Sequence, residues 1–217
     1  MTHLDPAARA AALPGPAPVE RFAAENALTP LDRAMDRYAD GDDTAFTVIF
    51  AGLAPRVRAF LRRLSGSPDL AEDLTQETFL KLHQARGSFV RGRSVVPWTY
   101  AIARNCYMSH ARSPKARLSR ASVEVTKVEL KAELGASAEE AAMAREGAKV
   151  VERALAEMTP ARREAFILLR YEGLSVAAAA QVLGVTEGAL KLRAFHAYET
   201  IRSALKAMED ATGPSLS

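Results

Sequence analysis

The sequence lacks the features of a secreted, membrane-spanning or disulfide-bonded protein. Its 217 residues include one cysteine, Cys106, which cannot form an internal disulfide bond. No stretch approaches the roughly 18 consecutive apolar residues that span a bilayer. The first 28 residues contain no basic segment followed by an apolar one, so they do not resemble a signal peptide. These absences predict a protein of the reducing cytoplasm in which residues 1–28 form a flexible leader.

Strong net charge and enzyme motifs are also missing. The 29 basic and 26 acidic residues leave a formal net charge of +3, too small for the whole surface to attract polyanions. The four histidines are scattered, and neither a His-Glu-x-x-His zinc motif nor a glycine-rich phosphate loop occurs. No base is evident for Cys106. We therefore expect no catalysis, and no metal ion, cofactor or small-molecule substrate.

Helical periodicity, in contrast, runs almost continuously past the leader, without alternation long enough for a pair of strands. Ser67-Pro68 and Thr159-Pro160 each place a hydroxyl N-cap before a proline, which is typical of a helix start. Glycines mark the expected helix ends. These glycines are Gly66, Gly87, Gly173 and Gly184. The expected helices cover residues 29–39, 43–64, 68–86, 96–112, 138–157, 160–171, 175–183 and 186–208.

A polar stretch over residues 113–137, broken by serine, proline and glycine, divides these helices into two groups. The sequence therefore predicts an all-α protein made of two small helical domains. Their expected limits are residues 29–112 and 138–208. Residues 113–137 are expected to be a flexible linker, and residues 209–217 a tail.

Acidic and basic residues are concentrated in different segments of the chain, which the net charge does not show. Residues 69–80 contain four acidic residues and no basic one. Between Gln84 and Arg120 there are eight basic residues and no acidic one, which predicts a local site for a polyanion. These basic residues are Arg86, Arg91, Arg93, Arg104, Arg112, Lys115, Arg117 and Arg120.

The expected helix over residues 70–82 has one apolar residue on its polar face. Leu80 projects between acidic and amide side chains rather than toward the apolar face. A single exposed leucine is common and needs no functional explanation. The alternative is a docking surface, in which Leu80 is an apolar anchor surrounded by groups that suit a basic partner helix. The candidate residues of this surface are Asp73, Gln76, Glu77 and Leu80.

The expected helix over residues 96–112 carries a stripe suited to single-stranded DNA. Asn105, Ser109 and Arg112 follow Trp98 at spacings of 7, 11 and 14 residues, close to multiples of the helical repeat. Aromatic rings stack on unpaired bases, and an asparagine can bond to base edges. A buried tryptophan in an ordinary core is the simpler alternative. The flanking acid-free segment favours nucleic acid.

Residues 174–193 have the spacing of a helix-turn-helix. Ala180 is a small residue where two helices would cross, Gly184 stands in the turn, and Leu190 is an apolar anchor in the second helix. Thr186 can cap that second helix. An αα-hairpin without a DNA role is the alternative. The side chains expected to enter the major groove are Lys191, Leu192, Arg193 and His196.

Together these motifs resemble the extracytoplasmic-function (ECF) group of bacterial sigma factors. Residues 69–83 are similar to region 2.2 of that family, residues 97–105 to regions 2.3 and 2.4, and residues 158–205 to region 4. Counterparts of region 1.1 and region 3 are not evident.

The resemblance implies a partner for each surface. The four docking residues would contact the clamp helices of the β′ subunit of core RNA polymerase, and region 4 the β flap. Asn105 would capture a flipped base of the promoter −10 element, with Trp98, Ser109 and Arg112 beside it. The −35 element would be read by Lys191, Arg193 and His196, and by Leu192, which departs from the family pattern and suits a thymine methyl.

Residues 188–199 are similar to a subgroup paired with membrane-embedded anti-sigma factors, which implies such a partner here. Two other functions fit parts of the pattern. An autonomous helix-turn-helix regulator would bind duplex DNA without polymerase. A sigma mimic would titrate an anti-sigma factor and bind no DNA. Four residues suited to DNA contact argue against it: Trp98, Asn105, Lys191 and Arg193.

Overall fold

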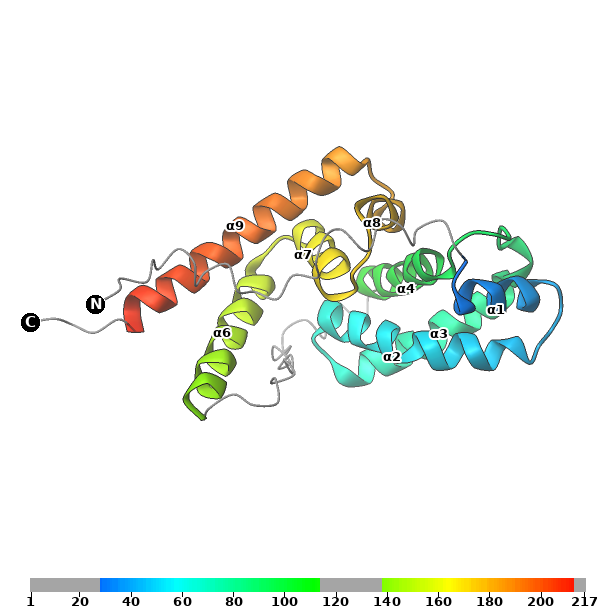
Figure 1. Ribbon diagram of the computed structural model, residues 1–217, viewed down its shortest axis with the longest axis horizontal. Coiled ribbons are helices and arrows are strands. Elements are labelled where there is room, and N and C mark those ends of the chain that lie inside the picture. Colours follow the sequence, from blue (N-terminus) through cyan, green and yellow to red (C-terminus); the bar gives the residue numbers. More distant parts are fainter. Residues whose placement is uncertain (1–27, 114–137, 213–217) are drawn as a thin grey trace, which may run out of the picture.

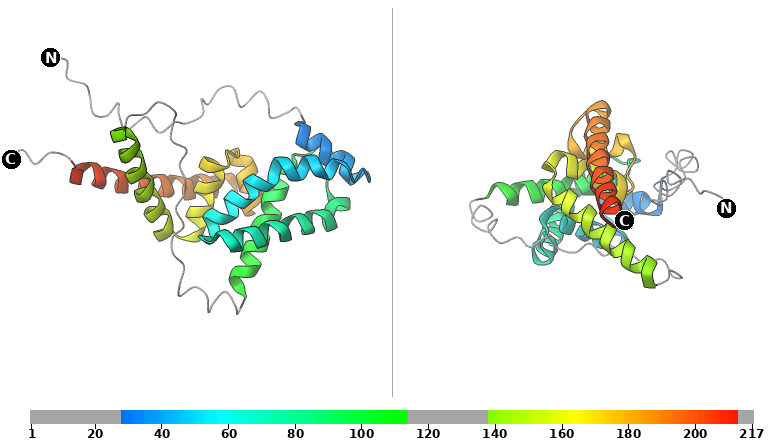
Figure 2. Two further views of the ribbon diagram at one scale, coloured as in Figure 1. Left: turned by 90° about the horizontal axis from the view of Figure 1, so that it is seen from below. Right: turned by 90° about the vertical axis from the view of Figure 1, so that its left-hand side faces the viewer.

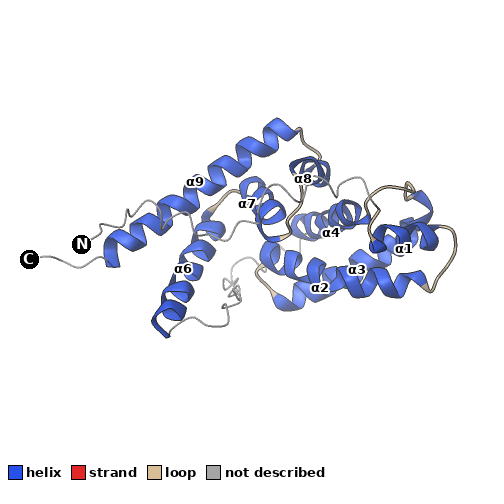
Figure 3. Ribbon diagram, viewed as in Figure 1, coloured by secondary structure: helices blue, strands red, loops and turns tan. Residues whose placement is uncertain are grey.

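A computed structural model describes residues 28–113 and 138–212, and every regular element in these ranges is helical (Figures 1 and 3). The expected all-α class is confirmed. The N-terminal bundle, residues 28–113, contains α1 (Pro30–Ala39), α2 (Ala45–Ser65), α3 (Pro68–Ala85), a 3₁₀ turn (Arg86–Ser88) and α4 (Val95–Arg112). The C-terminal unit, residues 138–212, contains α6 (Ala138–Glu157), α7 (Pro160–Phe166), the π-helical segment η4 (Ile167–Tyr171), α8 (Val176–Leu183) and α9 (Glu187–Thr212). The expected leader and linker and the end of the expected tail lie outside the described residues.

The helix boundaries follow the sequence signals with two exceptions. The Ser67 hydroxyl accepts a hydrogen bond from the Leu70 N–H at 3.3 Å, as expected of an N-cap. Thr159 precedes α7, but its side chain makes no capping hydrogen bond, so that part of the prediction is wrong. Helix α9 continues to Thr212, beyond the expected end at residue 208.

One buried carboxylate joins the start of α1 to the start of α4. Asp32 Oδ2 accepts hydrogen bonds from the Thr29 N–H at 2.9 Å and from the Thr29 hydroxyl at 2.8 Å, completing a capping box. Its Oδ1 accepts from the Val95 N–H, the first of α4, at 2.8 Å. The position of α4 is therefore set by a side chain 63 residues earlier in the chain.

The threonine hydroxyls in the core of the N-terminal bundle are satisfied within their own helices. Thr75 and Thr78 lie on the buried face of α3, and each donates to the carbonyl four residues earlier at 2.6 Å. Around them pack large, fully buried side chains from α1, α2 and α4. These include Met35, Tyr38, Leu53, Phe60 and Tyr100.

In the C-terminal unit, α9 packs against α6, α7 and α8 (Figure 2). A small apolar cluster fills the angle between α6 and α9. Its members are Ala154, Leu155, Met158, Phe166, Ala197 and Ile201. On α9, Leu190, Ala194, Ala197 and Ile201 are buried.

The two helical groups, which the sequence predicts as domains on a flexible linker, pack against each other. Helix α8 lies on α4, and η4 contacts α2 (Figure 1). Apolar residues of η4 and α8, such as Ile167 and Ala179, belong to the same buried cluster as Phe60 of α2 and Tyr100 of α4. The sequence contains no signal for this contact, since it joins residues far apart in the chain.

Candidate functional site

The polar face of α3 presents the expected docking residues, with one difference. Leu80 is 57% exposed, and Asp73 and Gln76 are also exposed. Glu77 is half-buried and accepts an ion-pair contact from Lys81 Nζ at 2.6 Å. The apolar anchor is thus available to a partner, while one of its two acidic neighbours already has a counter-charge.

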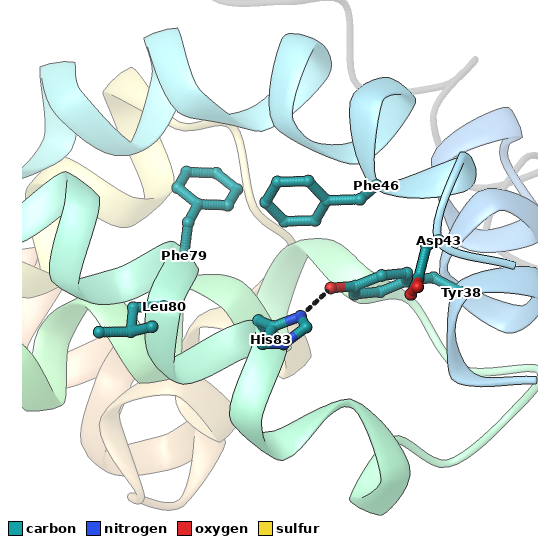
Figure 4. A pocket seen from close by; sticks show the side chains of 6 residues that line it. All are labelled: Tyr38, Asp43, Phe46, Phe79, Leu80 and His83. Carbon is teal, nitrogen blue, oxygen red and sulfur yellow. Dashed lines mark hydrogen bonds between the residues drawn. The ribbon is translucent and has the colours of Figure 1, made fainter. Parts of the chain in front are cut away.

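Beside Leu80 the structure contains an aromatic pocket that is not among the sites predicted from the sequence. Its volume is about 350 Å³ (Figure 4). The lining residues are Tyr38, Asp43, Phe46, Phe79, Leu80 and His83. The Tyr38 hydroxyl and His83 Nδ1 form a short hydrogen bond that joins α1 to α3 on one side of this aromatic pocket.

The aromatic pocket continues into exposed apolar surface on α2. Phe50 is 45% exposed and its ring meets that of Phe79 edge-on, with centroids 4.8 Å apart. At the rim, Asp43 accepts a hydrogen bond from Arg86 at 2.6 Å. An apolar floor next to acidic side chains suits an amphipathic helix with basic flanks. The spacing of Phe46 and Phe50, one helical turn apart, was the available sequence signal.

The stripe expected on α4 is divided by the fold. Asn105, Ser109 and Arg112 are exposed on one side of the helix. Trp98 is half-buried, and its ring packs on Phe89 with centroids 5.1 Å apart. Trp98 therefore belongs partly to the core, as the simpler interpretation of a tryptophan proposes.

Three bases of the acid-free segment are paired with acids from elsewhere in the chain. Arg86 pairs with Asp43, and Arg91 pairs with Asp40. Arg104 Nε lies 2.9 Å from Glu164 Oε2 in the C-terminal unit. The segment thus offers fewer free charges to a polyanion than its composition predicts. Of the remaining bases, Arg93 and Arg112 are exposed, and Lys115, Arg117 and Arg120 lie outside the described residues.

Helices α8 and α9 form the expected helix-turn-helix. Ala180 and Leu190 are buried, and Gly184 has a φ of 65°, the left-handed conformation that glycine adopts without strain. The Thr186 hydroxyl accepts from the Ala189 N–H at 3.2 Å, which confirms the predicted cap. The turn chemistry therefore fixes where α9 begins.

The first turns of α9 carry the side chains expected to contact DNA. Lys191, Leu192 and His196 are exposed, whereas Arg193 is half-buried. Leu192 is 58% exposed and Phe195 is 57% exposed, so this surface is apolar as well as basic. It offers hydrogen-bond donors together with apolar groups of the kind that can contact thymine methyls.

The described residues were also compared with what a metal site, a reactive thiol or a membrane-spanning helix requires. No cluster of three histidine, cysteine or acidic side chains is arranged to hold a metal ion there. Cys106 is buried, and burial raises the pKa of its thiol, which disfavours a reactive thiolate. None of the helices within residues 28–113 and 138–212 is long and apolar enough to cross a bilayer.

Comparison with known proteins matches both helical groups to one family. Residues 49–117 match Sigma-70 region 2, and residues 148–201 match Sigma-70 region 4. The chain is 35% identical to the RNA polymerase sigma factor CarQ of Myxococcus xanthus, over 81% of this chain and 97% of CarQ. It is 32% identical to the ECF RNA polymerase sigma factor SigF of Caulobacter vibrioides, over 82% of this chain and 95% of SigF.

The fold agrees with these matches. The sigma factor RpoE of Bartonella quintana, solved in complex with the anti-sigma factor NepR, superposes with a TM-score of 0.59 and 28% identity. The alignment covers 74% of this chain and 96% of RpoE. Sequence and fold thus both match sigma factors over nearly the full length of those proteins, and the chain belongs to the ECF family of RNA polymerase sigma factors.

Proposed function

We propose that the protein binds core RNA polymerase through α3 and directs initiation at promoters that α4 reads at −10 and α9 reads at −35. In this proposal residues 29–112 act as the region 2 domain and residues 138–208 as the region 4 domain. The observation that carries it is the combination of an exposed apolar anchor on α3 with two separate DNA-compatible helices in one chain.

Polymerase docking is supported by the shape and chemistry around Leu80. A partner helix can insert an apolar side chain into the aromatic pocket while its basic residues face Asp73 and Glu77. The clamp helices of the β′ subunit are the proposed partner, by resemblance to the family. The β flap is the proposed partner of the C-terminal unit.

Promoter opening is assigned to the exposed stripe of α4. Asn105 can hydrogen-bond the edge of an extruded base, and the exposed part of the Trp98 ring can stack beside it. Ser109 and Arg112 extend the stripe toward the backbone of the same strand. Unstacking one base costs a few kcal/mol, which capture by these groups offsets.

Recognition of the −35 element is assigned to the first turns of α9. Lys191, Arg193 and His196 supply donors for phosphates and base edges, and Leu192 supplies an apolar contact for a thymine methyl. The protein acts in this proposal where core polymerase and chromosomal DNA are found, in the bacterial cytoplasm. An anti-sigma factor is a further proposed partner, since the similar RpoE was solved with one. The resemblance of residues 188–199 favours a membrane-embedded type.

The docking surface is tested with Leu80→Asp. We expect this variant to lose co-purification with core polymerase and to keep its helical circular dichroism, because Leu80 is exposed. Met143→Asp is the matched control, since Met143 is 63% exposed on α6 and has no assigned role. Undiminished polymerase binding by Leu80→Asp would refute the docking surface. Specific footprinting of duplex DNA without polymerase would instead support an autonomous regulator.

The role of α4 is tested with Asn105→Ala. We expect promoter opening, measured by permanganate reactivity of unpaired thymines near −10, to fall more than formation of the closed complex. The reason is that an extruded base exists only in the open complex. Equal loss in both steps would count against base capture.

A further inference from the structure

A buried polar network ties the C-terminal unit to the N-terminal bundle. Glu172, which follows η4, is 8% exposed, and its Oε2 accepts a short hydrogen bond from the Tyr100 hydroxyl of α4. Its Oε1 lies 3.1 Å from Arg63 Nη1 of α2. The backbone carbonyl of the same residue accepts a hydrogen bond from Arg56 Nη2 at 3.0 Å. Glu172 thus contacts two helices of the other unit, α2 and α4.

A second pair lies on the same interface. Glu164 of α7, with a side chain only 4% exposed, pairs with Arg104 of α4. Arg104 adjoins Asn105, the residue proposed to capture a base. The contact between units therefore involves the helix that we assign to the −10 element and pairs one of its cations with an acid of the other unit.

The backbone of the C-terminal unit is shaped to deliver Glu172 to this network. The Glu172 N–H donates to the Ile167 carbonyl at 3.0 Å, a five-residue closure that widens the helix into η4. The Arg63 guanidinium then lies over the Tyr171 ring, 4.4 Å from its centroid. Local π-helical segments are frequent at functional sites, and this one is located at the junction between the units.

Such a network specifies one arrangement without making it very stable. Removing two charges from water costs about as much as their attraction returns, so a buried ion pair is a weak source of net stability. Arg63 Nε is buried and has no hydrogen-bond partner among the described residues. A partly satisfied polar network is less favourable than an apolar contact. The network therefore adds specificity to the apolar contact between the units and contributes little net stability of its own.

The closed arrangement is incompatible with simultaneous contact to both promoter elements. Helix α8 packs on α4 and α9 packs on α8, and packed helix axes lie about 8–10 Å apart, so the start of α9 is roughly 20 Å from α4. The −10 and −35 elements are about 25 base pairs apart, or about 85 Å along B-form DNA. The two units must separate before both elements can be bound.

We propose that Glu172 and Glu164 form an intramolecular latch, which docks α7, η4 and α8 onto α2 and α4 in the free protein and opens when the protein engages polymerase and a promoter. Only the opening on polymerase and a promoter rests on the proposed function; the closed form of the free protein does not. The segment of residues 114–137 permits the opening, because a fully extended chain of that length reaches about 80 Å.

The latch is tested by fluorescence energy transfer between dyes on Asp69→Cys of α3 and Ala177→Cys of α8. Both positions are exposed and have no assigned role, and the natural Cys106 is buried. The closed form is perturbed with the double variant Glu164→Ala/Glu172→Ala. In this variant Tyr100, Arg63 and Arg104 lose their carboxylate acceptors, and they regain hydrogen bonds only if the interface opens to water. Glu146→Ala is the control, because its pair with Lys149 is exposed and lies within α6.

We expect high transfer in the free wild type and in the Glu146→Ala control. The double variant should have low transfer with unchanged helical circular dichroism, since the closed-to-open ratio should fall by about a hundredfold. Tyr100→Phe removes a single hydroxyl and leaves the aromatic ring in place. This variant should lower the energy transfer by a smaller amount. Transfer in the wild type should drop when core polymerase and promoter DNA are added.

Low transfer in the free wild type, or high transfer in the double variant, would overturn the latch. High transfer in a transcribing complex would overturn the required opening. Absence of polymerase binding would instead overturn the proposed function, while the measurements on the free protein would still decide whether the latch exists.

Discussion

The carboxylate of Asp32 should make a large contribution to the stability of the N-terminal bundle. Asp32→Ala removes the capping box of α1, which typically costs about 1 kcal/mol. It also leaves the Val95 N–H buried without its acceptor, which costs about 1–3 kcal/mol more. The expected loss in the free energy of unfolding is therefore about 2–4 kcal/mol.

Urea denaturation followed by circular dichroism measures this loss. Asp43→Ala is the matched control, because Asp43 is exposed in the same region and contributes only a surface ion pair to Arg86. We expect the control to unfold at nearly the wild-type urea concentration. If Asp32→Ala is no less stable than Asp43→Ala, the buried carboxylate does not join α1 to α4 in the way described, and the positioning of α4 must be explained differently.

Two further predictions concern the latch and the −35 contact. Burial raises the pKa of Glu172, against the opposing effects of Tyr100, Arg63 and Arg56, so the closed form binds a proton more tightly than the open form. Closure should therefore be favoured as the pH falls from about 8 to about 5 and lost as the pH rises through the raised pKa. Energy transfer in the free wild-type protein should rise on acidification. This rise should be absent in Glu172→Ala. A fall in the wild type on acidification would contradict the prediction. For Leu192, replacing the contacted thymine of a selected −35 element by uracil should weaken binding about two- to fourfold, the value of one buried methyl, and Leu192→Ala should abolish the difference. Equal sensitivity of both proteins to uracil would exclude the methyl contact.

Much of the fold follows from local sequence signals. The helix-turn-helix was predictable because its spacing, its turn glycine and its cap all act within a few residues, and Ala180, Gly184 and Thr186 occupy the expected positions. The exposure of Leu80 was predictable for a similar reason, since the periodicity of α3 alone determines which face is polar.

The features that the sequence did not reveal depend on residues distant in the chain. Trp98 is partly withdrawn from the polar stripe because Phe89, in the preceding loop, packs on its ring. The aromatic pocket requires three helices to meet, and the latch places Glu172 against residues more than 70 positions earlier. Local periodicity contains no information on such pairs, so a tether between two domains was the simplest expectation.

The pairing of Arg86 with Asp43 and of Arg91 with Asp40 has a consequence for specificity. A cation strengthens binding to duplex DNA by displacing ions condensed on the phosphates, and one already neutralised by a neighbouring carboxylate contributes less to this gain. The unassisted chain should thus bind bulk chromosome weakly and with a shallow dependence on ionic strength. Under the proposed function, weak binding to random sequence would keep the molecule free to find core polymerase, and the assembled complex rather than the subunit alone would search for promoters.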